Sequence, residues 1–577
     1  MKNTYTKNEA TAWPVPNYWD GLALVLVLAV IIVLVLGAGQ MVGHYQIGET
    51  IKISLNPREL PYYALRSVMR MLIALGCSLI FTFTIGTLAA KNKHAERILI
   101  PMIDILQSVP VLGYLSFTAI LFITLFDGSM FGPECACIFV IFTSQVWNMT
   151  LSFYQSLRTV PEDLNEAAAM FQLSAWQKFW RVDVPFAMPG LLWNTMLSMS
   201  ASWVYLVASE AITVVKPAIM LPGIGSYIAL AISHADKTAI LYAILGMFVV
   251  IFLYDQLLFR PLVAWGEKFK TEESGDEVVP RSWVLDLFQR GDFFQFIITS
   301  FARVADFIVN IKYFRRRPKK WMSQQITFWH KFLIFAWNAC LCGAIIVAMI
   351  VLYRFIFSTA PSEEILRVIY LGFITALRVF AMILLSSLVW VPIGVFIGLN
   401  PRASQIVQPI AQFLAGFPVN LLFPIAALVI VRYHLNVNVW TSPLMILGAQ
   451  WYILFNVIAG TVAIPNNLKM AVKTLNVRGW LWWRRLILPG IFPYYITGVI
   501  TAAGGAWNIS ILSEAVSWGH IHLNAVGLGA YISTVSQNDN FPDLALAITV
   551  MSLYVVLVNR TIWRPLYNLA EKRYQVR

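Results

Sequence analysis

Matched ionisable residues stand near the ends of apolar stretches in this sequence and are its first candidates for chemistry. Glu210 and Glu514 each follow a long apolar run, both in the motif Ser-Glu-Ala and 304 residues apart. A carboxylate inside a membrane is costly and is usually paired. A glutamate open to an anion would also repel it. We therefore expect a structural role for both, either holding the neighbouring loop or pairing with a base.

Four basic residues are matched in the same way. Arg70 and Arg378 stand early in corresponding apolar stretches, and Lys216 and His520 each lie six residues beyond one of the glutamates. A cleft lined by one sign of charge concentrates a ligand of the other sign, and the arginine fork suits oxyanions. These residues predict a pathway for an anion. Two alternatives stay open: the arginines snorkel to headgroups, and Lys216 pairs with Glu210.

No set of residues for covalent chemistry or nucleotide binding stands out. The sequence has no G-x-x-x-x-G-K-[ST] loop to hold ATP phosphates. Its five cysteines lie in or beside apolar runs without a histidine or carboxylate cluster, which favours packing over zinc binding: Cys77, Cys135, Cys137, Cys340 and Cys342. A membrane-embedded transferase would need a clustered acid, base or metal set. We expect no catalytic residue, metal or cofactor.

The elements that position these residues use lipid as their solvent. Hydrophobic residues make up 59% of the 577 residues and charged residues 12%, against about 45–50% and about 25% in soluble domains. The net charge of +13 comes from basic clusters between apolar runs, a membrane-protein pattern rather than a nucleic-acid-binding one. The polar first 20 residues, and the lack of a cleavage site after 21–37, predict a retained first span.

Twelve membrane spans are expected, since about 20 apolar residues suffice to cross a bilayer. They start near residues 21, 66, 98, 133, 187, 239, 331, 367, 406, 441, 491 and 543. The connections that hold Lys91, Lys178, Arg260 and Arg402 fall on one face with the tail from Arg564. The positive-inside rule makes this face, with both termini, cytoplasmic. The predicted fold class is an all-α polytopic membrane protein.

The two halves of the chain repeat each other. At an offset of 304 residues, Trp147, Pro185 and Trp203 recur as Trp451, Pro489 and Trp507; at an offset of 308, Arg70 and Pro110 recur as Arg378 and Pro418. Rare residue types held at constant offsets indicate a duplication. Six spans per half keep the repeats in one orientation and predict a pathway at their interface, around an axis along the membrane normal.

Each half has one polar segment between its fourth and fifth spans. In the first, Pro161 and Glu162 suit the start of a helix. Small residues follow, and then an amphipathic stretch with Trp176 and Trp180 suits the membrane interface. The predicted structure is a short helix on the cytoplasmic surface.

These segments resemble the "EAA" loop of ABC-importer permeases, with the pattern Glu-Ala-Ala, three residues, Gly, nine residues, Ile-x-Leu-Pro. The matching positions are Glu166, Ala167, Ala168 and Gln172 in the first copy and Met470, Ala471, Val472 and Asn476 in the second; the copies close on Val182-x-Val184-Pro185 and Leu486-x-Leu488-Pro489. Gln172 and Asn476 replace the glycine, and the second copy lacks the glutamate. In that family, the helix of this loop seats in a groove of the ATPase subunit.

The resemblance implies a type I ABC-importer permease fold in a fused, duplicated form. The implied organisation is a cytoplasmic N-terminus with the first span (1–60), a first permease repeat (61–268), a cytoplasmic linker (269–328), a seventh span (329–365) and a second permease repeat (366–577). The motif Ser-Glu-Ala followed by Gly-x-Gly-x-Tyr-Ile looks like the nitrate, sulfonate, taurine and bicarbonate branch.

The resemblance also implies partners and a location. Two copies of an ABC ATPase subunit supply ATP hydrolysis, a periplasmic or lipid-anchored binding protein supplies the substrate, and the chain lies in a bacterial inner membrane. The basic run Arg315–Lys320 of the linker is expected to meet anionic headgroups. A secondary transporter is the alternative, but it would usually place ionisable residues at mid-membrane. A bulky charged residue at Ala167 or Ala471 is expected to detach the ATPase.

Overall fold

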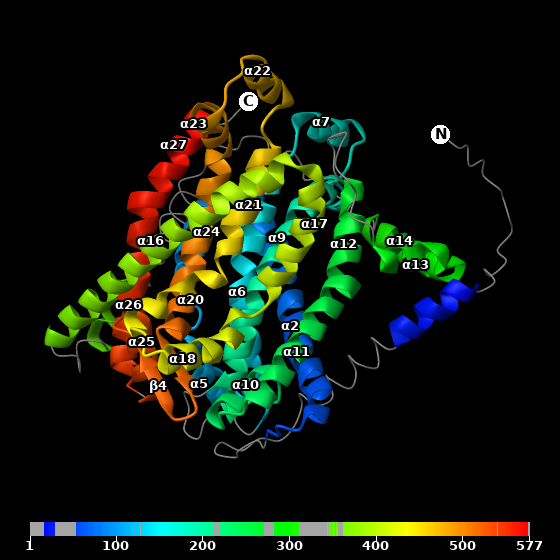
Figure 1. Ribbon diagram of the computed structural model, residues 1–577. Helices are drawn as coiled ribbons and strands as arrows, with labels where there is room; N and C mark the ends of the chain where they lie inside the picture. The colour runs from blue at the N-terminus through cyan, green and yellow to red at the C-terminus, as the bar shows by residue number, and fades with distance from the viewer. Residues whose placement is uncertain are drawn as a thin grey trace. The chain divides into compact units, whose positions relative to one another are not determined.

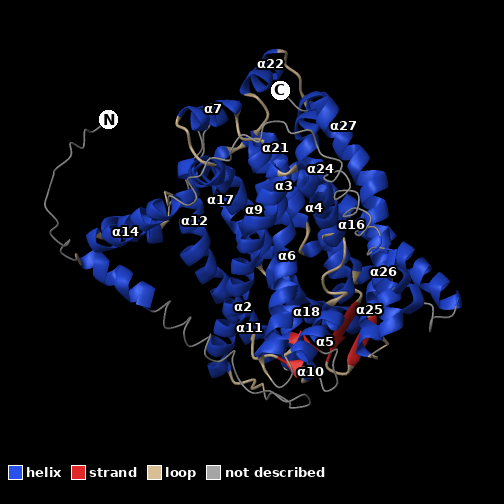
Figure 2. Ribbon diagram, turned by 180° about the vertical axis from the view of Figure 1, so that it is seen from behind, coloured by secondary structure: helices blue, strands red, loops and turns tan. Residues whose placement is uncertain are grey.

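The computed structural model describes residues 17–28, 53–126, 129–212, 219–269, 282–310, 362–538 and 540–574, with a few residues between 343 and 355. Helices dominate. Among the described residues, the only strands form two antiparallel hairpins, β1 (Ala211–Ile212) with β2 (Ile219–Met220) and β3 (Ala515–Trp518) with β4 (Ile521–Asn524) (Figure 2). The predicted helical architecture is confirmed.

The first half contributes a helix Tyr18–Leu28 and then a series of helices up to the linker. They are α2 (Leu60–Phe81), α3 (Thr87–Lys91), α4 (Lys93–Leu106), α5 (Leu115–Leu125), α6 (Phe131–Arg158), α7 (Glu162–Met170), α8 (Ala175–Lys178), α9 (Val184–Glu210), α10 (Ile224–Ser233), α11 (Lys237–Tyr254) and α12 (Arg260–Gly266). The linker adds α13 (Trp283–Arg290) and α14 (Asp292–Val309).

The second half follows the same order. Its helices are α16 (Ser362–Leu399), α17 (Pro401–Gly416), α18 (Phe423–Arg432), α19 (Val437–Trp440), α20 (Ser442–Leu447), α21 (Gln450–Val462), α22 (Asn466–Thr474), α23 (Gly479–Trp482), α24 (Leu488–Ser513), α25 (Leu528–Gln537), α26 (Phe541–Val558) and α27 (Arg564–Tyr574).

The duplication holds at the level of single residues. α7 and α22 have the same length and are 304 residues apart, and so are α8 and α23. Even the π-helical turns recur at this offset: Phe179–Asp183 matches Trp483–Ile487, and Asp255–Phe259 matches Asn559–Trp563. π-Helical turns are rare and often mark functional positions, so two matched pairs are strong evidence for a conserved repeat geometry.

The described residues contain fewer clear spans than the twelve expected. Six helices are long and apolar enough to cross a membrane, or up to eight if two bent pairs each count as one span. One bent pair, Pro401–Gly416 with Val419–Arg432, breaks by 75°. The predicted first span is described only as far as Leu28, and almost all of the seventh lies outside the described residues. The count of twelve is therefore not confirmed.

By its internal contacts the chain divides into two compact units that do not follow the predicted domain boundaries, which stay predictions. The first comprises Met1–Gln40, Leu151–Met196 and Phe252–Gln324, and the second comprises Met41–Thr150, Leu197–Ile251 and Gln325–Arg577. The first unit contains α7, α8, α13 and α14. The second contains both hairpins and all of the second repeat.

The core of the second unit is built by both repeats. α16, α21, α24 and α26 pack together there (Figure 1), and Val111, Leu112 and Tyr205 of the first repeat share their hydrophobic cluster. Two polar contacts tie the repeats: the Val111 N–H donates to Asn508 Oδ1 at 2.7 Å, and Asn420 Nδ2 donates to the Val204 carbonyl at 3.3 Å. Val111 and Asn420 lie where the helix of each repeat is interrupted. Each interrupted helix therefore meets the other repeat.

Candidate functional site

Glu210, the last residue of α9, lies fully buried at a junction of four segments. Its Oε1 accepts hydrogen bonds from Arg70 Nη1 at 2.7 Å and from Ser67 Oγ at 2.5 Å, both on α2. Its Oε2 accepts from the Gly225 N–H at 2.7 Å, at the start of α10. Its own carbonyl accepts from the Ser226 hydroxyl at 2.7 Å. The carboxylate and the carbonyl of this one residue therefore tie α9 to α2 and α10.

A second buried carboxylate, Glu134 of α6, completes the charge balance. It accepts two hydrogen bonds from Arg70, from Nε at 2.5 Å and from Nη2 at 2.7 Å, and one from Arg66 Nη2 at 2.5 Å. The Arg70 side chain is 0% exposed. Two arginines thus face two glutamates in a closed, neutral cluster. A buried ion pair is tolerated when its geometry is good and its remaining hydrogen bonds are satisfied.

The second repeat builds the same junction with fewer charges. Glu514 accepts from Thr375 Oγ1 at 2.9 Å, from Arg378 Nη1 at 3.2 Å and from the Gly529 N–H at 2.7 Å. Asn438 stands at the position of Glu134 and accepts from Arg378 Nη2 at 3.2 Å.

The position of Arg66 is occupied by an apolar residue, Ile374, in the second repeat. Two charges are thus lost together, one acid and one base. Each repeat keeps a neutral cluster, so charge balance has constrained both copies.

The four predicted pathway bases have different settings. Arg70 is enclosed, with its charge matched by two carboxylates, whereas the Arg378 side chain is 12% exposed. His520 is exposed at the turn between β3 and β4. Its neighbour Gly519 donates its N–H to the Ile232 carbonyl at 2.9 Å, which ties this turn to α10. Lys216 lies outside the described residues.

Gly223 and Gly527 leave room for the two buried glutamates. A Cβ at either position would collide with the carboxylate, that of Glu210 or Glu514. We expect Gly223→Ala to lower the free energy of unfolding by about 1–3 kcal/mol, as overpacking does. Thermal unfolding of the detergent-purified protein measures it. Gly504→Ala on α24 is the matched control, because a Cβ there has no neighbour within 4 Å; an equal loss in both variants would contradict the packing argument.

The two polar loops have the same backbone. α7 and α22 each span nine residues and each follow a proline N-cap in an extended conformation, Pro161 and Pro465. Gln172 and Asn476 both adopt a positive φ of 52°, the left-handed conformation that favours glycine. This explains why the related loops have glycine at that position.

The hydrogen bonds that end the two helices also match. In the first loop, the N–H groups of Gln172 and Leu173 donate to the carbonyls of Ala169 and Ala168. The second loop has the same pair, from Asn476 to Lys473 and from Val477 to Val472. This is the Schellman pattern of helix termination. Matching positions of the two loops therefore hold their side chains on equivalent backbone geometry.

Exposure separates the eight predicted docking residues into a surface set and a supporting set. Glu166, Gln172, Met470, Ala471 and Asn476 are exposed, Ala167 and Val472 are half-buried, and Ala168 is buried. Two residues that the sequence pattern did not single out, Phe171 and Leu475, lie on the same surfaces and are 79% and 74% exposed at the ends of α7 and α22. The available signal was a large apolar residue at the 304-residue offset inside a polar loop.

The linker supports the first loop. Gln177 of α8, which is 7% exposed, donates through Nε2 to Asn310 Oδ1 just beyond α14 at 3.0 Å, and Arg181 Nη2 lies 3.7 Å from Asp306 Oδ1. The residue that matches Gln177 in the second loop is Leu481, which is 51% exposed. Among the described residues, only the first loop has this support from a linker helix.

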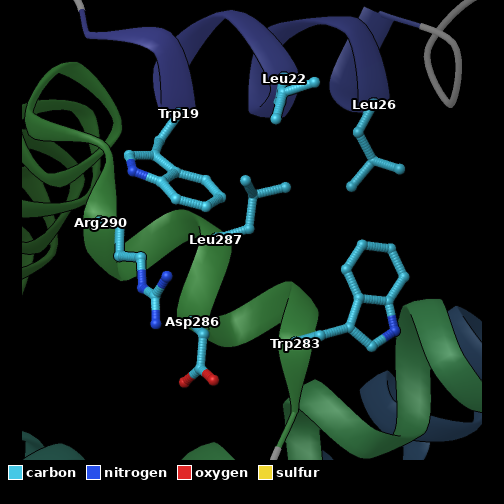
Figure 3. A pocket seen from close by; sticks show the side chains of 7 residues that line it. All are labelled: Trp19, Leu22, Leu26, Trp283, Asp286, Leu287 and Arg290. Carbon is cyan, nitrogen blue, oxygen red and sulfur yellow. The ribbon is translucent and has the colours of Figure 1, made fainter.

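The same unit contains an apolar recess between the helix Tyr18–Leu28 and α13 (Figure 3). Arg290 lies over the Trp19 ring, with 5.1 Å from Cζ to the centroid. The lining residues are Trp19, Leu22, Leu26, Trp283, Asp286, Leu287 and Arg290. Leu26 and Leu287 point into it from the two helices (Figure 3), and most of its lining is apolar, so it is suited to apolar contact rather than to an ion.

The repeat, the paired junctions and the paired loops agree with the family comparison. Residues 82–260 and 390–564 each match the model of the binding-protein-dependent transport system inner membrane component. The chain belongs to this family. It is thus a multi-pass inner-membrane permease component without catalytic function, and the family implies an ABC ATPase and a binding protein as partners. The predicted duplication is confirmed by the double match.

Relatives are distant. The bicarbonate transport system permease protein CmpB of Synechococcus elongatus is 25% identical over 177 residues, 30% of this chain and 60% of the relative. The nitrate import permease protein NrtB of Synechocystis is 23% identical over 192 residues, 33% and 65%. The taurine transport system permease protein TauC of Escherichia coli is 25% identical over 203 residues, 34% and 68%. The match thus spans about 60% of the length of the first of these relatives.

Proposed function

We propose that this permease component imports a small anion, with six spans in each half and both termini in the cytoplasm. The observation that carries the proposal is the pair of surface helices, α7 and α22, with the same backbone and the same ends in two loops of an importer permease. A scaffold protein would not need two copies of such a loop. α9 aligns with α24 and is 27 residues long, which supports a span in each half at this position.

The proposed role of α7 and α22 is to seat in the grooves of two ATP-binding subunits. Phe171 and Leu475 serve as apolar anchors, since a few well-packed residues carry most of the binding energy of an interface. The positions from Glu166 to Ala168 and from Met470 to Val472 line the contact. Closure of the ATPase then moves α9 and α24, which continue from these loops through matched π-helical turns.

The substrate class rests on the relatives, whose names refer to bicarbonate, nitrate and taurine. Permease sites form where interrupted helices meet at a repeat interface, and the contacts of Val111 and Asn420 mark such a place in the second unit. Of the four predicted pathway bases, Arg378 keeps an exposed edge and is the one that we retain for contact with the anion. We assign Arg70 to the closed cluster.

Uptake into proteoliposomes tests the proposed function. The complex is reconstituted with its ATPase and binding protein, and labelled bicarbonate, nitrate and taurine are supplied in separate assays. We expect uptake of one of them to rise at least tenfold with ATP and to remain at background with a non-hydrolysable ATP analogue. Uptake driven by an ion gradient without ATP would instead support the secondary transporter.

A further inference from the structure

The two docking helices carry opposite charge on the same backbone. Glu162, Asp163 and Glu166 of α7 are all exposed, and this helix has no basic residue. α22 has Lys469 half-buried and Lys473 exposed, and it has no acidic residue. Three negative charges on one helix are thus replaced by two positive charges on the other.

The loops around the helices extend this contrast. Residues 159–185 include four acidic and two basic side chains, whereas residues 463–489 include five basic and no acidic ones. The buried junctions around Glu210 and Glu514 differ from the loops in this respect, since the net charge of each junction is zero although their residues have been substituted. The charge of the loops has therefore diverged at a surface, while the interior has kept its balance.

The helix macrodipole does not account for the difference. It favours acids in the first turn and bases in the last turn of any helix, and this suits Glu162, Asp163 and Lys473. The macrodipole would therefore favour acids at the start and bases at the end of each helix. Each helix instead carries charges of one sign only. Glu166 of α7 is matched by Met470, and Asn165 is matched by Lys469, so the contrast continues through the middle of the helix.

Among the described residues, the charges of α7 and α22 have no ion-pair partner. Within the part of the chain that the structure describes, no ion pair involves Glu162, Asp163, Glu166, Lys469 or Lys473. Partial burial lowers the pKa of the Lys469 ammonium below its ordinary value, and a carboxylate supplied by a partner would raise it again. Within the described residues, the two helices therefore present unmatched charge of opposite sign.

We propose that the two helices bind two different ATP-binding subunits or domains, a basic groove receiving α7 and an acidic groove receiving α22. This inference rests on the proposed docking function, and it replaces the expectation of two copies of one subunit. A single groove cannot be complementary to both helices, because like charges placed together across an interface oppose binding. The apolar anchors Phe171 and Leu475 are shared, so charge supplies the discrimination.

A lipid surface is the competing occupant for α22, since lysines attract anionic headgroups. The backbone of α22 is the same as that of α7, however, from the proline N-cap to the terminating hydrogen bonds. The acidic residues of α7 would be repelled from an anionic lipid surface. The common backbone is explained if both helices bind the same kind of partner, namely a groove on a protein. The charge then indicates which groove each helix enters.

Site-specific photocrosslinking tests the inference. A benzoylphenylalanine is placed at Met170 in one variant and at the matched Thr474 in another, both exposed and uncharged, in the full-length chain in its native cells. Crosslinked peptides are assigned to proteins that contain a G-x-x-x-x-G-K-[ST] loop. We expect two different ATP-binding polypeptides, or two different domains of one, from the two positions.

The same ATP-binding domain captured at both positions would overturn the inference and leave the proposed function supported. Capture of no ATP-binding protein at either position would overturn both. Capture of lipid alone at Thr474 would also overturn the inference. As a second measurement, the triple variant Glu162→Gln, Asp163→Asn, Glu166→Gln should weaken retention of the α7 partner about tenfold at low salt. Retention of the α22 partner should not change, and an equal loss of both would contradict separate grooves.

Discussion

Arg70→Gln is expected to destabilise the protein more than the matched variant Arg378→Gln. Removing Arg70 leaves Glu210 without its counter-ion and Glu134 with Arg66 alone, all of them buried. Breaking a buried ion pair from one side costs about 3–5 kcal/mol. Arg378 is partly exposed and makes longer bonds to Glu514 and Asn438, so its loss should cost about 1.5–3 kcal/mol, as for a hydrogen bond to a charged group. Thermal unfolding in detergent measures both.

A charge-matched double variant provides the control. Arg70→Gln with Glu210→Gln removes one charge of each sign and leaves Glu134 with Arg66. It should regain part of the stability lost in Arg70→Gln, since coupled residues are non-additive. If Arg70→Gln unfolded like the wild type but lost anion uptake, Arg70 would belong to the pathway and the closed cluster would not be its main role.

The buried junctions illustrate how far the sequence could predict this structure. The matched Glu210 and Glu514 stood out because a carboxylate in an apolar run is costly, and this led to the expectation of a partner or a loop contact. The identity of the partners required the fold. Arg70 and Glu134 are 64 residues apart on α2 and α6, and no periodicity in either helix indicates which residue of the other it meets.

The structure of the two polar loops was easier to predict from the sequence, because it depends on residues that are close together in the chain. A proline followed by acids predicted the start of α7, and the glycine position of the family pattern fell on residues with positive φ, Gln172 and Asn476. The exposure of Phe171 could not be predicted in this way. Hydrophobicity suggests burial, and only the folded structure shows that this side chain is 79% exposed.

The span count was limited by a different factor. Apolar length alone counts interrupted helices and continuous ones in the same way. In the second repeat, Pro418 and the segments around it bend two helices by 75° where a continuous span was expected. An X-Pro step favours such a break, but the choice between a kink and a re-entrant turn is made by contacts with the other repeat, such as that of Asn420 with Val204.

The largest functional effect is expected from removing both apolar anchors. Phe171→Ala with Leu475→Ala removes the most exposed matched pair of large side chains from α7 and α22 while leaving both helix ends intact. Truncation of an interface anchor costs about 2 kcal/mol or more, so each ATP-binding subunit should be held about 30-fold less tightly, or weaker still. Co-purification of the ATPase and ATP-driven uptake should both fall to background.

The two single variants show the contribution of each loop to this result. Phe171→Ala and Leu475→Ala should each release one ATP-binding subunit and stop uptake, because transport needs both loops to move. Leu384→Ala, which shortens an exposed apolar residue on α16, is the control. It should change neither the co-purification of the ATPase nor the ATP-driven uptake. Full retention of the ATPase in the double variant would contradict the anchor role of these residues. The contact would then lie on the charged positions of α7 and α22, where the neutralising variants would show the greater loss.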